Sequence, residues 1–420
     1  MNAYIIDPMR PLLFLAAITL LPAQAPYTLL IKGGHVIDPK SGRSAKLDVA
    51  IQGQRIAKVA ANIPASQATR IANADGLYVV PGLIDIHAHV YTGTGIKALT
   101  GDSSVYPDSF SFRSGVTTLV DAGSSGWRNF EDFKQRIIDR AQTRVLAFVN
   151  IVGNGMSPSG EDDNAEMQSA QAAAIARKHS GIVVGFKTAH YAGEGWPSID
   201  GAIAAAKATD RPIMVDFGYM SLDRNLRTLL GDKMRPGDIY THCYSGHRGE
   251  LGEDGKVNTA FVTGRKRGVI FDVGHGGGSF YWNIASPLTE QGFWPDSIST
   301  DLHTGSMNAG MKDMTNVMSK MLTLGASLED VIKMSTWNPA KQIKRPELGN
   351  LDEGAEADIT VLKLEQGQFG YIDSAGASRT GDKKLTAELT IRSGRVLWDL
   401  NGRAATDWKS FKYQKRAALP

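Results

Sequence analysis

Apolar and polar positions along the chain change their periodicity twice. Between residues 27 and 80, short β-like runs alternate with turn signals such as Lys32-Gly33-Gly34 and Gln52-Gly53-Gln54. The runs cover residues 28–31, 35–37, 47–51, 55–59 and 77–80. This part of the chain therefore predicts a small antiparallel sheet.

From residue 82 to about residue 340, apolar strands alternate with helical stretches. The pattern begins with a strand over residues 115–122, a helix over 130–140 and a strand over 144–151. Further strands are predicted at residues 182–187, 212–217, 239–243, 269–273 and 297–301. With the strand that precedes residue 90 they make eight, the number that closes a parallel (β/α)8 TIM barrel.

After residue 346 the chain returns to β-like pieces. These cover residues 358–363, 385–391 and 395–398, and a turn-rich connection over residues 349–358 leads into the first. The predicted fold is α/β: a barrel over residues 81–345 and a small β-sandwich domain from both chain ends, residues 26–80 plus 346–402. Residues 403–420 form a C-terminal tail.

Composition restricts both the kind of molecule that the protein binds and the residue types that can bind a metal. The formal net charge of +3 is spread along the chain, so no basic patch indicates nucleic-acid binding, and a small-molecule substrate fits better. The single cysteine, Cys243, excludes an intrachain disulfide and any cysteine-rich zinc module. Protein ligands to a metal must therefore be histidine, carboxylate or a modified lysine. The sequence leaves open whether the chain forms a homo-oligomer.

The first 25 residues have the pattern of a secretory signal peptide. Met9-Arg10 precedes an apolar stretch over residues 12–21, which Pro22 ends before Ala23-Gln24-Ala25. We expect cleavage after Ala25, a periplasmic or secreted location and no stable membrane span afterwards. A buried N-terminal helix or a short membrane anchor is the alternative, and the true start is either Met1 or Met9.

Candidate chemistry begins with a His-x-His pair. Side chains alternate along a strand, so His87 and His89 at the end of the apolar run lie on the same face. Such a pair supplies half of a metal site, although chance or packing explains an isolated one.

Four other predicted strands end in residues that can bind a metal. They are Lys187 after the fourth strand, Asp216 after the fifth, His242 after the sixth and Asp301 after the eighth. Functional side chains of a barrel collect at the carboxyl ends of its strands. Agreement among five strand ends is much stronger evidence for a metal centre than the pair alone.

The motifs PGLIDIHAH, VVGFKTAHY, THCYSGH, FDVGHGGGSF and STDLHTGSMN resemble the amidohydrolase superfamily, in particular its dihydroorotase-like amidohydrolase/deacetylase group. The resemblance runs from about residue 28 to about residue 402. It implies that His87, His89 and Asp301 hold one divalent metal and that His242 holds a second. It also implies that CO2 carboxylates Lys187 to a carbamate that bridges the two. Zinc is the expected metal, with manganese or iron as alternatives.

Lys187 needs a physical account, because an ammonium group cannot bind a cation. Burial disfavours the charged form, and a neutral amine adds CO2 to give an anionic carbamate with two oxygen ligands. An ordinary lysine in a salt bridge is the alternative.

Asp216 departs from the pattern of the family, in which the fifth strand commonly ends in a histidine ligand. A carboxylate also binds zinc, manganese or iron. The second site is therefore either kept with a harder ligand, weakened or empty.

Other histidines near these motifs have less defined roles. His275 lies beside three glycines at the seventh strand end, where backbone can approach a ligand closely, and it is predicted to bind substrate or stabilise the transition state. A loop histidine held by packing is the alternative. His190, His247 and His303 are each expected either to hydrogen-bond a metal ligand or to face the substrate, and none is assigned as a metal ligand.

These residues predict a hydrolase in which metal-bound hydroxide attacks a carbonyl and Asp301 is the general base. The expected substrate is an amide or cyclic amide, such as an N-acyl amino acid or a similar small acylated compound. An esterase, lactonase or phosphoesterase with the same site is an alternative, and a ligand-binding barrel without catalysis is another. Arg128 either pairs with a substrate carboxylate or is an ordinary surface arginine.

Overall fold

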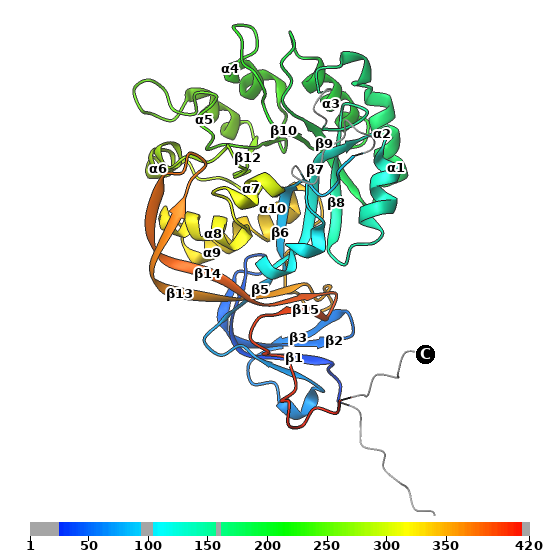
Figure 1. The fold of residues 1–420 in the computed structure, drawn as a ribbon, viewed down its shortest axis with the longest axis vertical. Helices are drawn as coiled ribbons and strands as arrows, with labels where there is room; N and C mark the ends of the chain where they lie inside the picture. The colour runs from blue at the N-terminus through cyan, green and yellow to red at the C-terminus, as the bar shows by residue number, and fades with distance from the viewer. Residues whose placement is uncertain (1–24, 94–103, 157–160, 414–420) are drawn as a thin grey trace, which may run out of the picture.

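Two structural parts make up the molecule, a barrel covered by helices and a sheet in which both ends of the chain meet (Figure 1). The computed structural model describes residues 25–93, 104–156 and 161–413. The predicted signal peptide lies outside the described residues except for Ala25, as do the last seven residues of the predicted tail. In the part of the chain that is described, no helix is long and apolar enough to cross a membrane.

Seven parallel strands of the barrel follow one another around the sheet in sequence order, as the alternating pattern predicts. Their residues are almost all buried, which explains why the strands appear as continuous apolar runs. They are β6 (Leu83–Ala88), β7 (Val116–Gly126), β8 (Arg144–Asn150), β9 (Val183–Thr188), β10 (Ile213–Val215), β11 (Ile239–Tyr240) and β12 (Ile270–Phe271).

The eighth predicted strand, residues 297–301, closes the ring without forming a regular strand. Parallel bridges join Ser297 to Asp272 on one side and Leu302 to Ala88 on the other. Between them the amide of Thr300 donates to the Asp85 carboxylate, so a side chain takes the place of a ladder partner. The prediction of a strand is therefore wrong at this segment, whereas the prediction of a closed eight-membered barrel is confirmed.

Helices cover the outside of the barrel (Figure 1). The predicted helix over 130–140 is α1 (Phe130–Phe133), continued by a π-helical turn over Lys134–Ile138. The others are α2 (Ser169–Lys178), α3 (Pro197–Lys207), α4 (Leu226–Thr228), α5 (Thr259–Lys266), α6 (Trp282–Glu290), α7 (Thr304–Asn308), α8 (Met314–Thr323), α9 (Leu328–Met334) and α10 (Trp337–Gln342).

The second part is one hydrogen-bonded sheet with the order β15-β14-β13-β5-β1-β2-β3, and β4 pairs with β1. Its strands are β1 (Leu29–Asp38), β2 (Arg43–Gln52), β3 (Arg55–Ala60), β4 (Ile71–Asn73), β5 (Tyr78–Pro81), β13 (Ile359–Ile372), β14 (Ser378–Arg392) and β15 (Arg395–Asp399). Edge strand β3 also bonds to the segment before β13, through the Ile56 amide and the Ala355 carbonyl. The sheet thus curls around its own apolar core, as a sandwich-like domain from both chain ends requires.

Two details of this sheet differ from the sequence prediction. β4 and β5 run parallel to β1, so the sheet is mixed and not antiparallel; β5 continues through Gly82 directly into β6, which ties its direction to the entry of the barrel. The predicted turn at Lys32-Gly33-Gly34 is a bulge inside β1, because Gly33 adopts a left-handed φ of 78° and the pairing with β2 resumes beyond it. The predicted turn at residues 52–54 is confirmed.

The hairpin of β13 and β14 extends beyond the small sheet and climbs one side of the barrel (Figure 1). Tyr371, Leu385 and Ala387 of this hairpin belong to the core of the barrel. The carbonyl of Tyr371 accepts a hydrogen bond of 3.2 Å from the indole of Trp282. The outer half of the hairpin, although its residues fall within 346–402, therefore packs as part of the barrel.

Candidate metal centre

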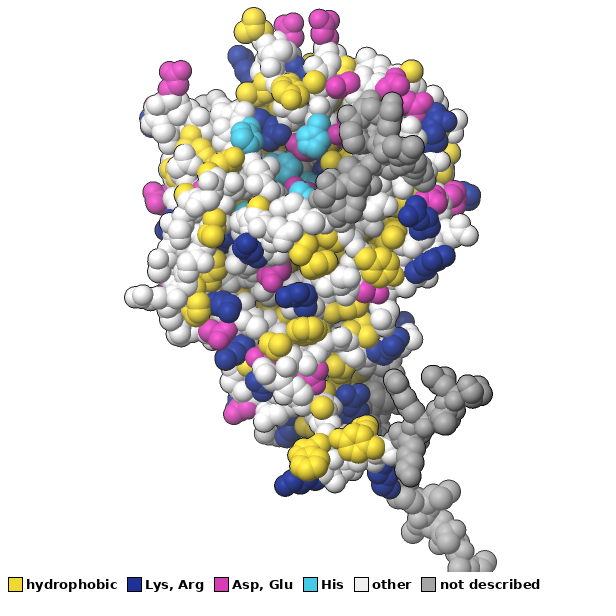
Figure 2. Space-filling model, viewed as in Figure 1, with side chains coloured by type: hydrophobic (Ala, Val, Ile, Leu, Met, Phe, Trp, Pro, Cys, Tyr) yellow, Lys and Arg dark blue, Asp and Glu magenta, His cyan; other side chains and the backbone are white. Residues whose placement is uncertain are grey.

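The strand ends of the barrel meet at a cavity of about 220 Å³. A group of histidines marks a hollow over this end of the barrel in the space-filling view (Figure 2). The cavity is lined by six of the seven predicted site residues together with three others: His87, His89, Lys187, Asp216, His242 and Asp301, with Met156, His190 and His303. Only His275 of the predicted set is not among the lining residues.

His87, His89 and Asp301 form a compact group of metal donors. One donor atom from each lies within 4.8 Å of the other two, and all three residues are buried. Asp301 Oδ1 is 3.5 Å from His87 Nε2 and 3.0 Å from His89 Nε2. Two imidazoles and one carboxylate form a donor set that divalent zinc, manganese or iron accepts.

A hydrogen-bond relay fixes the ring of His87. Thr241 Oγ1 donates to Asp272 Oδ2 over 2.8 Å, so its oxygen accepts from His87 Nδ1, 2.9 Å away. Nδ1 therefore carries the proton, and Nε2 presents its lone pair to the cavity. A hydrogen-bond partner on the far ring nitrogen orients an imidazole and selects its tautomer.

The other two imidazoles are held in the same manner. Nδ1 of His242 donates to the carbonyl of Gly274 over 2.6 Å. Nδ1 of His89 is 2.8 Å from Ser124 Oγ. In all three rings Nδ1 is thus tied to the protein, and Nε2 lies on the cavity side beside a carboxylate or Lys187.

Lys187 is buried at the centre of the site. Its Nζ lies 3.0 Å from His87 Nε2, and among the described residues it forms no ion pair, unlike the salt-bridged lysine of the alternative interpretation. Burial lowers the pKa of Lys187, which favours the neutral amine that can react with CO2. A glycine on the neighbouring strand makes room for this side chain, because a Cβ at Gly123 would lie 2.7 Å from Lys187 Cβ.

Asp216 is buried among three nitrogen donors. Its Oδ1 accepts from Arg248 over 2.7 Å, while its Oδ2 lies 3.0 Å from His190 Nε2 and 3.4 Å from His242 Nε2. Burial alone would raise the pKa of Asp216, but the two imidazoles outweigh burial and hold that pKa well below its ordinary value. The carboxylate is therefore ionised.

The electrostatics of Asp301 are similar. Burial opposes its ionisation, yet the neighbouring imidazoles of His87 and His89 hold the pKa of Asp301 below its ordinary value. The Gly276 backbone packs against this carboxylate, since a Cβ at Gly276 would lie 2.5 Å from Asp301 Oδ2. Glycine at this position thus permits a close approach between backbone and carboxylate.

Left-handed backbone conformations mark three lining residues. His190, His242 and Asp301 have φ values of 50°, 62° and 51°. For residues with a side chain this conformation costs on the order of 1 kcal/mol, and it collects at functional sites, where the surrounding structure enforces it. The strain aims all three side chains into one cavity.

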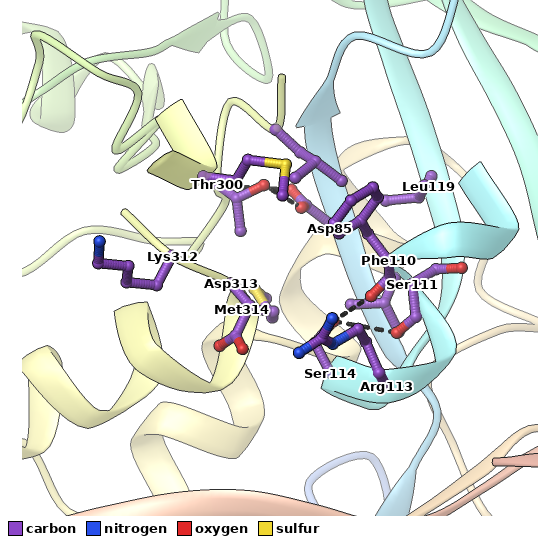
Figure 3. Close-up of a pocket in the computed structure, with 13 residues that line it drawn as sticks. Asp85, Phe110, Ser111, Arg113, Ser114, Leu119, Thr300, Lys312, Asp313 and Met314 are labelled. Carbon is purple, nitrogen blue, oxygen red and sulfur yellow. Dashed lines mark hydrogen bonds between the residues drawn. The ribbon is translucent and has the colours of Figure 1, made fainter. Parts of the chain in front are cut away.

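Asp85 holds the backbone segment that precedes Asp301. It accepts from both the amide and the hydroxyl of Thr300, the residue before Asp301, and so fixes the backbone that carries this ligand (Figure 3). Burial raises the pKa of Asp85 to about 7. The carboxyl borders a separate cavity of about 210 Å³ that includes Arg113 and Lys312 but none of the metal donors.

The structure places the His275 ring away from the metal cavity. Nδ1 donates to the Gly276 carbonyl over 2.9 Å, and Nε2 accepts from Lys320 Nζ over 2.7 Å, while Phe280 stacks on the ring. Neither ring nitrogen is left for a substrate. The catalytic role of His275 stays a prediction, and it would require one of these bonds to break.

Sequence reasoning overlooked the residues that orient the side chains of the cavity. Thr241, Ser124, Asp272, Glu161 and Arg248 come from separate strands or loops, and their relation to the site depends on tertiary contacts. Thr241 adjoins a predicted ligand, which is the only local signal. Arg128, considered as a substrate contact, pairs instead with Glu166 at 2.6 Å on the surface.

Comparisons with known proteins agree with this geometry. A sequence model of the amidohydrolase family matches residues 283–397. A deacetylase of Agrobacterium fabrum is 32% identical over 366 residues, which cover 84% of this chain and 87% of that protein. A deacetylase of Brucella anthropi is 33% identical over 311 residues, which cover 72% of this chain and 75% of that protein.

Solved structures agree on the fold. An adenine deaminase superposes with a TM-score of 0.80 at 28% identity, covering 89% of this chain and all of that chain, 100%. A dihydroorotase superposes with a TM-score of 0.74 at 28% identity, covering 88% of this chain and 98% of that chain.

Proposed function

Because this chain belongs to the amidohydrolase family, we propose that it is a metal-dependent hydrolase of carbon–nitrogen bonds other than peptide bonds. We further propose an amide or cyclic amide of a small acylated compound, such as an N-acyl amino acid, as the substrate. The observation that carries the proposal is the buried group of His87, His89 and Asp301, with three donors within 4.8 Å at the barrel mouth. The deacetylase names of the two relatives support an acylated amine as substrate.

His87, His89 and Asp301 would hold the first ion, together with a carbamate on Lys187. Their chemistry fits a divalent cation, because both imidazoles have fixed rings and Asp301 is ionised. We propose zinc as the metal. A divalent ion at this position supplies Lewis acidity, which acidifies a water molecule and polarises the scissile carbonyl.

The protein residues perform the proton transfers. Asp301 would accept the proton of the attacking water and deliver it to the departing nitrogen. Its Oδ1 lies beside both imidazoles, and its Oδ2 lies against the Gly276 backbone, so the carboxylate keeps one orientation. Burial of the site limits access of further water and strengthens these interactions.

The size of the cavity restricts the substrate. A space of about 220 Å³ admits a small acyl group or a small ring beside the ligands, with the remainder of the substrate directed outward. His303 lines the same cavity and can contact the substrate.

The decisive experiment compares bond classes on metal-loaded protein. N-acetyl and other N-acyl amino acids, small cyclic amides and aryl esters would be assayed before and after chelation, with Asp301→Asn as the matched inactive variant. We expect hydrolysis of an amide that disappears on chelation and returns with zinc. Hydrolysis of esters alone would refute the amide assignment, and no bound metal would refute the function as a whole.

Export of the chain is a separate proposal. The apolar segment over residues 12–21, followed by Ala23-Gln24-Ala25, supports secretion with cleavage after Ala25. N-terminal sequencing of protein from the periplasm or medium of a bacterial host tests it. A chain that begins at Met1 or Met9 in the cytoplasmic fraction would contradict it.

A further inference from the structure

A second set of donors faces the first across the cavity. It consists of His190, Asp216 and His242, and Lys187 lies among both sets as a lining residue of the same cavity. Each set contains two imidazoles and one carboxylate. From the sequence, His190 was assigned no ligand role.

The carboxylate–imidazole separations are nearly the same in the two sets, whereas among the described residues only the first set has all three donors within 4.8 Å of one another. In the second set, Asp216 Oδ2 is 3.0 Å from His190 Nε2 and 3.4 Å from His242 Nε2. In the first set, Asp301 Oδ1 is 3.0 Å from one imidazole and 3.5 Å from the other. Tetrahedral zinc with bonds of about 2.0–2.1 Å places neighbouring donors about 3.3 Å apart. Both carboxylates thus lie at ligand spacing from two imidazole nitrogens.

The ring of His190 is oriented as the rings of the other ligands are. Its Nδ1 is 2.7 Å from Glu161 Oε2, and Asn150 Nδ2 donates to the other oxygen of Glu161 over 3.1 Å. A carboxylate on Nδ1 fixes the ring and directs Nε2 toward Asp216. The His190 side chain is 54% exposed, whereas Asp216 is 3% exposed, so an incoming ion reaches the set from the His190 side.

The backbone of His190 is left-handed, like that of His242 and Asp301, with φ of 50° against 62° and 51°. This conformation costs on the order of 1 kcal/mol, although histidine adopts it more readily than most residues with a side chain. The conformation turns the side chain back from the loop toward the end of β10.

The positive charge of Arg248 explains why the structure tolerates a buried carboxylate, Asp216, after β10. Asp216 adds one negative charge that a neutral histidine at this position would not bring. Arg248, with its side chain 10% exposed, donates to Asp216 Oδ1 over 2.7 Å and offsets that charge. Oδ2 is left for the two imidazoles and for an ion between them.

We propose that His190 supplies the imidazole ligand that the fifth strand lacks, so that His190, Asp216 and His242 hold a second divalent ion. The proposal rests on the proposed metal-dependent function. In this proposal the imidazole ligand expected at the end of β10 comes instead from the loop that follows β9. Glu161 and Arg248 are positioning residues that act on His190 and Asp216.

The test measures metal content and not activity. Purified protein would be stripped, reloaded with zinc or cobalt(II), and analysed for bound metal per chain, for cobalt ligand-field spectra and for anomalous scattering. We expect two ions in the wild type and one in His190→Asn, with the first ion's affinity unchanged. His247→Asn is the matched control, because His247 lies near the site in sequence but does not line the cavity, and it should keep two ions.

Glu161→Gln gives a second measurement that leaves all proposed ligands in place. It should lower the affinity for the second ion about 10–100-fold and leave the first ion unchanged. This variant carries the test if His190→Asn does not fold in the presence of chelator.

Three results would overturn the proposal in distinguishable ways. Two ions in His190→Asn with wild-type affinity would exclude His190 as a ligand. One ion in the wild type would mean that protons and Arg248 alone balance Asp216, and the proposed function would stand with a single metal. No ion in the wild type would refute the proposed function together with this inference.

Discussion

Thr241→Val tests whether the relay behind His87 prepares the metal centre. The substitution keeps the shape of the side chain and removes only the hydroxyl. That hydroxyl joins His87 Nδ1, 2.9 Å away, to Asp272 Oδ2, 2.8 Å away, and all three residues are buried. The variant therefore removes two buried hydrogen bonds, one of them to a carboxylate.

The expected cost follows from these contacts. A neutral hydrogen bond contributes about 1 kcal/mol and one to a charged group about 2 kcal/mol, so the metal-free protein should lose about 3 kcal/mol of unfolding free energy. Asp272 keeps its bonds from Ser297 and Ser299, which limits the loss. Metal affinity should fall about 10–100-fold, because the proton on Nδ1 is no longer fixed.

Thr117→Val is the matched control. Thr117 is also a buried threonine of a barrel strand, but its hydroxyl has no hydrogen-bond partner among the described residues. Its replacement should change the unfolding free energy by less than about 1 kcal/mol and leave metal binding unaltered. Urea unfolding in chelator measures stability, and competition with a chromophoric chelator at fixed pH measures affinity. Equal effects in the two variants, or wild-type affinity in Thr241→Val, would refute the reasoning.

Three further variants test other parts of the structure. Asp301→Asn should lower kcat at least about 10³-fold and reduce bound metal, and kinetics with metal analysis would reveal an unexpected retention of both. Lys187→Met should bind less metal and lose the carbamate carbon signal of wild-type protein reloaded in ¹³C-bicarbonate, whereas no such signal in the wild type would contradict carboxylation. Lys320→Met removes three contacts of 2.7 Å, to His275, Gly310 and Ile372, and should cost about 3 kcal/mol in urea unfolding; an unchanged midpoint would contradict this.

The architecture of the barrel could be predicted from the sequence because parallel strands buried on both faces leave continuous apolar runs. The same rule failed at residues 297–301, where the chain closes the ring through isolated bridges and the Asp85 side chain replaces a backbone partner. The β-like runs over residues 28–31 and 35–37 likewise did not indicate that they form the single bulged strand β1. Pairing partners, which a local pattern does not contain, decided both cases.

The lining of the cavity shows the same division. The convergence of His87, His89, Lys187, His242 and Asp301 on one cavity could be predicted, since each stands at a strand end, and all strand ends of a barrel converge on one face. The sequence analysis assigned His275 a role in substrate binding or transition-state stabilisation and assigned His190 no ligand role. The structure turns His190 into the cavity through a left-handed φ and ties both nitrogens of His275 to Gly276 and Lys320.

The sequence by itself determined the barrel, the contribution of both chain ends to the second sheet, and a His-His-Asp group at the strand ends. These follow from periodicity and topology, which are local or nearly so. The tertiary structure alone decided which nitrogen each imidazole presents, what balances the charge of Asp216, and where His190 points. Those properties depend on hydrogen bonds and charges between residues far apart in the chain, such as Thr241 with His87 and Arg248 with Asp216, and distance in space is fixed only when the chain has folded.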